Sequence, residues 1–123
     1  MHKLIGLSIV TALAATTSAG CKTGNPQQRN DIIAAIGGIK PPLDNCYQIA
    51  LARNRKTAGG FITVELIAEA GTGQFKNVII RRDEVRDPSV RMCVINEVSK
   101  IKLPKPPDSN VQIPYAFRFT PVN

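Results

Sequence analysis

The chain begins with a positively charged residue, Lys3, a largely apolar run over residues 4–15, and a stretch of small residues that ends at Gly20. These are the parts of a secretory signal peptide. The apolar run is shorter than the roughly 20 residues that a membrane-spanning helix needs, and it lacks the alternating polar positions of an amphipathic first helix. We therefore expect residues 1–20 to be removed on export, which leaves a chain of the right length for one small domain.

The residue after this leader is Cys21, and the tetrapeptide at 18–21 (SAGC) resembles the lipobox of bacterial lipoproteins, although Ser18 stands where that motif usually has an aliphatic residue. The resemblance implies that Cys21 becomes the first mature residue and carries acyl chains such as palmitate. Lys22 follows in place of the aspartate that retains such proteins at the inner membrane, which implies an anchor in the outer membrane, facing the periplasm. A cut after Ala19, which would release a soluble protein, is the alternative.

A polar segment, KTGNPQQRN at 22–30, follows the cysteine. It contains Gly, Pro and Gln and has no apolar period, which is typical of a flexible linker. We expect residues 21–30 to act as a tether and residues 31–123 to form a single domain. Because two or more acyl chains give stable anchoring, the tether would hold that domain at the membrane.

Cys46 and Cys93 remain once Cys21 is assigned to the anchor. An even number of cysteines in an oxidising compartment favours a disulfide, and the long loop that this pair would close is worth about 4 kcal/mol in the chain-entropy treatment. Two buried free thiols are the alternative. The chain has no CxxC motif, and its single histidine, His2, lies in the leader. A zinc site or a thiol nucleophile would therefore lack its partners, and we expect no metal.

Two segments, 43–56 and 87–100, place their apolar residues at helical spacing. Each carries one cysteine on its apolar face, Cys46 in the first and Cys93 in the second. The second opens on an Asp-Pro pair, which suits a helix start because the aspartate caps and the proline needs no N–H partner in the first turn. A shorter helix is expected over 31–37, where two glycines end it.

Alternating apolar and polar residues predict a strand over 61–69 and a second strand over 74–82, joined by the turn Gly-Thr-Gly. In the second strand, Phe75 and Val78 should both face inward although they lie three positions apart. Strict alternation forbids that spacing, so it requires a β-bulge or a late start of the strand.

The last predicted strand, 111–120, contains Pro114. Proline has no N–H for the hydrogen-bond ladder, so this strand should lie at a sheet edge, or the proline at its margin. An exposed edge can accept a strand from a partner, whereas the alternative is that Pro114 blocks unwanted pairing. The candidate partner-docking edge consists of the residues that share one face of this strand: Ile113, Tyr115, Phe117 and Phe119.

The order of these elements predicts an α+β domain with the helices on one sheet face. Five features in series resemble the AgmX/PglI carboxy-terminal domain family, a relative of the TonB carboxy-terminal domain: the Cys46-Tyr47 pair, a basic segment with Gly at 53–60, the Gly-x-Gly turn, a second Cys after Asp-Pro, and a Pro-rich link before a closing Tyr-x-Phe-x-Phe strand. The resemblance covers about 43–120.

The resemblance implies two helices packed on a three-stranded antiparallel sheet, with the cysteine pair linking helix to helix. It also implies a role in the cell envelope, because TonB domains bind a short peptide of an outer-membrane partner as an added strand. This sequence departs from the family in having no energy-coupling transmembrane segment and in having Leu103 where an aromatic residue is usual. Force transmission is therefore not carried over.

The chain carries a formal charge of +7, with 16 Lys and Arg against 9 Asp and Glu. Basic surfaces can bind anionic envelope polymers such as peptidoglycan, or they can be ordinary solvated charge. Nucleic acid is not an expected partner, because aromatic residues do not alternate with the basic ones. The candidate basic patch consists of Arg53, Arg55, Lys56, Arg81, Arg82 and Arg86.

Catalysis is not expected from these residues. The single histidine leaves with the leader, no phosphate-binding loop is present, and the acidic residues fall at positions that favour exposed ion pairs. We expect a non-catalytic outer-membrane lipoprotein without a cofactor, acting as an interaction or accessory subunit of an envelope complex. Binding of peptidoglycan or another anionic polymer, or neutralisation of a periplasmic toxin, is the alternative.

Overall fold

The computed structural model describes residues 26–121. The expected signal peptide at 1–20 and the expected acylation site, Cys21, lie outside the described residues. The elements within that range are, in chain order, α1 (Pro26–Gly37), α2 (Lys40–Arg53), β1 (Gly60–Ala68), β2 (Phe75–Asp83), α3 (Pro88–Ser99) and β3 (Val111–Phe119).

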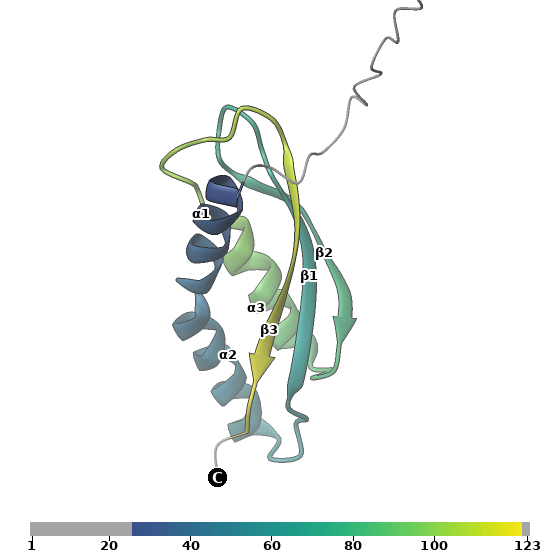
Figure 1. Ribbon diagram of the computed structural model, residues 1–123. Helices are drawn as coiled ribbons and strands as arrows, with labels where there is room; N and C mark the ends of the chain where they lie inside the picture. Colours follow the sequence, from purple (N-terminus) through teal and green to yellow (C-terminus); the bar gives the residue numbers. More distant parts are fainter. Residues whose placement is uncertain (1–25, 122–123) are drawn as a thin grey trace, which may run out of the picture.

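The strands form one antiparallel sheet in the order β2-β1-β3, and the helices lie together on one of its faces (Figure 1). This arrangement confirms the predicted α+β class and the predicted three-stranded antiparallel sheet. The alternation predicted for β1 is also confirmed, because one set of side chains is fully buried beneath the helices: Ile62, Val64, Leu66 and Ala68. The core lies between this sheet face and the apolar faces of the helices.

The helical layer contains all three predicted helices, and α1 includes the shorter helix predicted over 31–37 but begins earlier, at Pro26. Residues 26–30, predicted as part of the tether, are helical, so this part of the prediction is wrong. Pro26 fits the start of a helix because the N–H that it lacks would have no partner there. Ile32 and Ile36 of the same helix are fully buried in the core. Burial of one face therefore stabilises a helix whose first turn is polar.

The two helices α1 and α2 are joined through a tight turn at Gly38 and Ile39, in which the N–H of Gly38 donates to the C=O of Ala34 (3.1 Å). The second helix begins at Lys40, earlier than the predicted residue 43. Its first turn holds a Pro-Pro pair, and prolines are tolerated there because first-turn N–H groups make no helical hydrogen bond.

The sheet contains the β-bulge that the spacing of Phe75 and Val78 requires. The register shifts between the pairs Glu65–Ile79 and Ile67–Lys76, so that β2 has one residue more than β1 in this interval. Asn77 lies in the interval with φ at 53°, a backbone conformation that asparagine tolerates better than most residues. The pairing of β1 with β3, by contrast, runs without interruption.

A disulfide joins Cys46 of α2 to Cys93 of α3, with 6.5 Å between their Cα atoms. This confirms the predicted pair. The helix α3 begins as predicted, because the side chain of Asp87 accepts hydrogen bonds from the N–H groups of Ser89 and Val90. At the same end, Arg53 of α2 donates hydrogen bonds to Asp87 (3.4 Å) and Ser89 (2.8 Å), so polar contacts join this end of α3 to α2 in addition to the disulfide.

Candidate functional site

The strand β3 forms one edge of the sheet. It pairs with β1 on one side, and no other strand of residues 26–121 lies on its other side. The C=O of Phe61 accepts a hydrogen bond from the N–H of Glu84 (2.9 Å), so the main chain of Phe61 faces β2. Arg118 lies opposite Phe61 in the β1–β3 pair. Directly opposed residues of antiparallel strands exchange both main-chain hydrogen bonds or neither. The N–H and C=O of Arg118 therefore point away from the sheet.

Every second residue of β3 shares this orientation, because the direction of the main-chain groups alternates along a strand. We call the outward-pointing main-chain groups of Gln112, Pro114, Ala116 and Arg118 the free edge. The side chains of the same four residues are exposed on the outer face of the sheet. Within residues 26–121, one hydrogen bond reaches the free edge, from Lys40 Nζ to the carbonyl oxygen of Arg118 (2.5 Å).

Lys40 is held in this position by two further contacts. Its ammonium group forms an ion pair with Asp44 one turn along α2, and it lies 4.6 Å from the centre of the Phe119 ring. Pro114 contributes a C=O to the free edge but no N–H. The open part of the edge is thus centred on Ala116, which offers both a donor and an acceptor.

The predicted docking residues require a correction. The edge position of the strand is as predicted, but Ile113, Phe117 and Phe119 are each about 1% exposed, and Tyr115 is half-buried. Their side chains belong to the core of the protein itself. Side-chain direction and main-chain direction both alternate with a period of two, so the residues that face a partner are the complementary set, 112, 114, 116 and 118.

The predicted basic patch is divided by the fold. Three of its members each form an ion pair with a different carboxylate: Arg81 with Glu65 (2.7 Å), Arg82 with Glu84 (3.2 Å) and Arg53 with Asp87 (3.4 Å). The remaining three, Arg55, Lys56 and Arg86, are exposed and have no acidic partner among residues 26–121. We call these three residues the basic tip.

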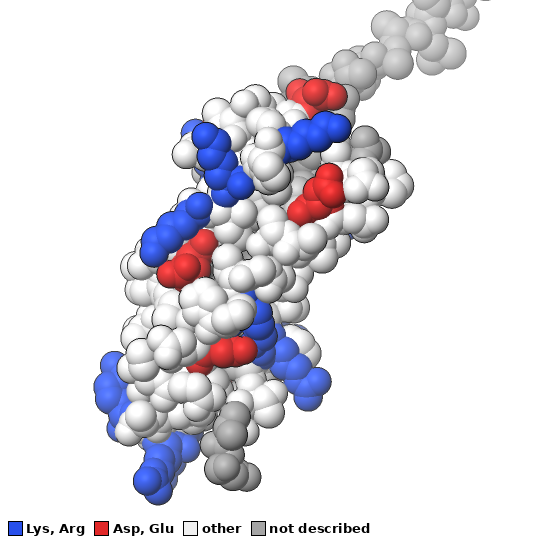
Figure 2. All heavy atoms as spheres, turned by 90° about the vertical axis from the view of Figure 1, so that its left-hand side faces the viewer, with Lys and Arg blue, Asp and Glu red and all other residues white. Residues whose placement is uncertain are grey.

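The basic tip lies where α2 ends, opposite the end at which the chain enters α1 (Figure 1), and Figure 2 shows Lys and Arg side chains gathered at that lower end. Lys56 and Arg86 line one open hollow of about 270 Å³ between the α2–β1 and β2–α3 loops. Asp87 also lines it, but its carboxylate is already bound by Arg53 and by the first turn of α3. The sequence did not show that two separate loops meet here.

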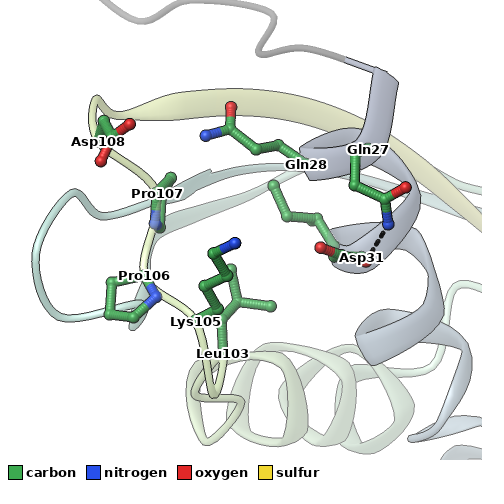
Figure 3. A pocket seen from close by; sticks show the side chains of 9 residues that line it. Gln27, Gln28, Asp31, Leu103, Lys105, Pro106, Pro107 and Asp108 are labelled. Carbon is green, nitrogen blue, oxygen red and sulfur yellow. Dashed lines mark hydrogen bonds between the residues drawn. The ribbon is translucent and has the colours of Figure 1, made fainter.

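A smaller cavity of about 190 Å³ lies between α1 and the Pro-rich connector that precedes β3 (Figure 3). Its polar lining includes Asp31, Lys105 and Asp108, and Gln27 donates a hydrogen bond to Asp31 (2.9 Å). The residues that line it include no cysteine, histidine or serine.

The two carboxylates with a displaced pKa serve local structure. A hydrogen bond from the Ser89 side chain, with further contributions from the N–H groups of Val90 and Ser89 and the charge of Arg53, lowers the pKa of Asp87. Hydrogen bonds from Lys76 and Thr72 lower the pKa of Glu69. A general acid at neutral pH needs the opposite displacement.

Among positions 26–121, no cluster of His, Cys, Asp and Glu is arranged to hold a metal ion. None of the helices in this range has the combined length and apolarity needed to cross a membrane. No family model, curated protein or solved structure matches the chain.

Proposed function

We propose that this chain is a non-catalytic outer-membrane lipoprotein whose domain docks a protein of the cell envelope by accepting a strand at the free edge. The observation that carries the proposal is the row of main-chain groups at Gln112, Pro114 and Ala116 that have no partner within residues 26–121, on an exposed edge strand. Unpaired groups of this kind are the template that strand addition uses.

Two further features support the proposal. The α+β arrangement with a disulfide between α2 and α3 agrees with what the resemblance to the AgmX/PglI and TonB carboxy-terminal domains implies. The lipobox-like tetrapeptide at 18–21 supports export and anchoring at the outer membrane. Acylation of Cys21 would keep the free edge within reach of other envelope proteins.

The free edge also limits the way in which a partner strand pairs. Ala116 offers an N–H and a C=O and so anchors the added strand, whereas Pro114 offers an acceptor alone. At Arg118 the C=O is occupied by Lys40 (2.5 Å), so a partner either stops before this residue or displaces the ammonium group. Each main-chain hydrogen bond contributes about 1 kcal/mol net. Loss of the Ala116 N–H should therefore lower the affinity for the partner strand.

The experiment removes that N–H and leaves the fold intact. An Ala116→Pro variant loses a donor that β1 does not use, so its melting temperature should stay close to that of the wild type. A photo-crosslinking amino acid at the exposed position Gln112 should attach an envelope protein in intact cells. That product should disappear in Ala116→Pro and persist in Ala116→Val, which keeps the N–H. A product that survives Ala116→Pro, or one that contains murein alone, would contradict docking at this edge.

A further inference from the structure

We propose that the basic tip is a binding site for an anionic polymer that lies on the side of the domain away from the membrane, with the carboxylates of peptidoglycan as its ligand groups. The orientation in this proposal rests on the lipid anchor proposed above. The argument uses the pairing of charges, the backbone at Arg86 and the position of the tip in the domain.

Pairing distinguishes the basic tip from the patch that the sequence predicted. Arg53, Arg81 and Arg82 each have a carboxylate within 3.4 Å, so their charges are largely compensated. Arg55, Lys56 and Arg86 have no such partner in the described part of the chain. The hollow between the two loops has one acid in its lining, Asp87, and that carboxylate is held by Arg53 and by N–H groups of α3. Within residues 26–121, the tip therefore presents positive charge that no acidic side chain neutralises.

The backbone holds Arg86 in a conformation that its side chain does not favour. Its φ is 58°, in the left-handed region where glycine or asparagine is usual. The carboxylate of Asp83 fixes this turn by accepting hydrogen bonds from the N–H groups of Val85 (3.0 Å) and Arg86 (2.9 Å), and Arg91 in turn holds Asp83 (3.0 Å). Glycine would be less strained in this turn, so the turn itself gives no reason for an arginine here. The Arg86 side chain is exposed to solvent, where it can contact a ligand.

The position of the tip identifies the class of ligand. The chain enters α1 at one end of the domain, and the loop that carries Arg55 and Lys56 lies at the other (Figure 1). A nine-residue strand such as β1 spans about 30 Å between these ends. With an anchor at Cys21, the tip would point away from the head groups of the membrane that holds the protein. An extended anionic polymer fits this position better than a lipid surface does.

The test compares two variants that lose the same charge. The tip variant is Arg55→Gln, Lys56→Gln and Arg86→Gly, and the control variant removes three paired cations, Arg81→Gln, Arg82→Gln and Lys100→Gln. The probes are purified sacculi, sedimented with the mature protein, and vesicles of phosphatidylethanolamine and phosphatidylglycerol. Each exposed contact of this kind is worth roughly a two- to fivefold change in affinity, so the tip variant should bind sacculi at least about tenfold more weakly. The control variant should bind like the wild type, and 0.5 M salt should release the wild type because it screens such contacts.

Equal weakening in both variants would show a response to net charge alone and would overturn the proposal. Unchanged binding by the tip variant would also overturn it, as would binding to the vesicles but not to the sacculi. Arg86→Gly should keep or raise the melting temperature, which separates loss of the site from loss of the fold. Ala116→Pro should bind sacculi normally and the tip variant should still crosslink its protein partner, so failure at one site is distinguishable from failure at the other.

Discussion

The disulfide between Cys46 and Cys93 should supply a large share of the stability of this domain. It closes a loop with a sequence separation of 47 residues, for which the chain-entropy treatment gives about 4 kcal/mol. A small domain has about 5–15 kcal/mol in total. Both cysteines are half-buried, so their replacement by alanine adds little loss of packing. A Cys46→Ala, Cys93→Ala variant should therefore lose about 4 kcal/mol and melt roughly 15–30 °C lower.

Urea unfolding followed by circular dichroism measures this difference, because the chain has no tryptophan for fluorescence. All proteins should carry Cys21→Ser, so that no third thiol can exchange with the pair. Wild-type protein unfolded in the presence of dithiothreitol is the matched control, and its midpoint should agree with that of the double alanine variant. A loss below about 1 kcal/mol, or equal midpoints for oxidised and reduced wild type, would refute the assignment of stability to this bond.

Two other predictions follow from local contacts, and a third follows from the lipobox-like tetrapeptide at 18–21. Asp87→Ala removes the cap of α3 and should cost about 1 kcal/mol in urea unfolding. The pKa of Asp87 is lowered, chiefly by the hydrogen bond from the Ser89 side chain. The contribution of this carboxylate to the free energy of unfolding is therefore fully present above the ordinary aspartate pKa. It is lost as the pH falls through the lowered pKa, so variant and wild type should converge in strong acid. Gly73→Ala should cost more than about 1 kcal/mol by thermal melting, since φ is +72° and a Cβ would lie 2.8 Å from the Leu103 carbonyl oxygen. Gly71→Ala, at a φ of +79° with nothing within 4 Å, should cost less. The mass of the amino-terminal peptide should show an acylated Cys21, and an unmodified thiol there would end the lipoprotein proposal.

The elements that depend on local pattern were predictable from the sequence. The alternation in β1 identifies its buried face because its partner on the β3 side pairs in unbroken register. The Asp-Pro pair at 87–88 identifies the start of α3 because capping is a contact between neighbours in sequence. The cysteine pair could be predicted because Cys46 and Cys93 are the two that remain once Cys21 is assigned to the anchor, and each falls on the apolar face of its own predicted helix.

Other features depend on contacts that sequence patterns do not carry. The first turn of α1 is polar, and its helical state depends on burial of Ile32 and Ile36 further along. Arg81 pairs with Glu65 across strands whose register contains a bulge, so sequence spacing gave no sign of that ion pair. The free edge was within reach of the sequence, because the residues that alternate with the buried face of β3 are those that point outward.

Amide hydrogen exchange of the purified protein, resolved by residue with NMR, tests most directly whether the edge of β3 is open. The N–H groups of Gln112 and Ala116 should exchange about as fast as those of exposed loops, because nothing within residues 26–121 accepts them. Those of Ile113 and Phe117, which face β1, should exchange far more slowly. Protection of Ala116 equal to that of Phe117 would show that the edge is already paired, and would contradict docking by strand addition.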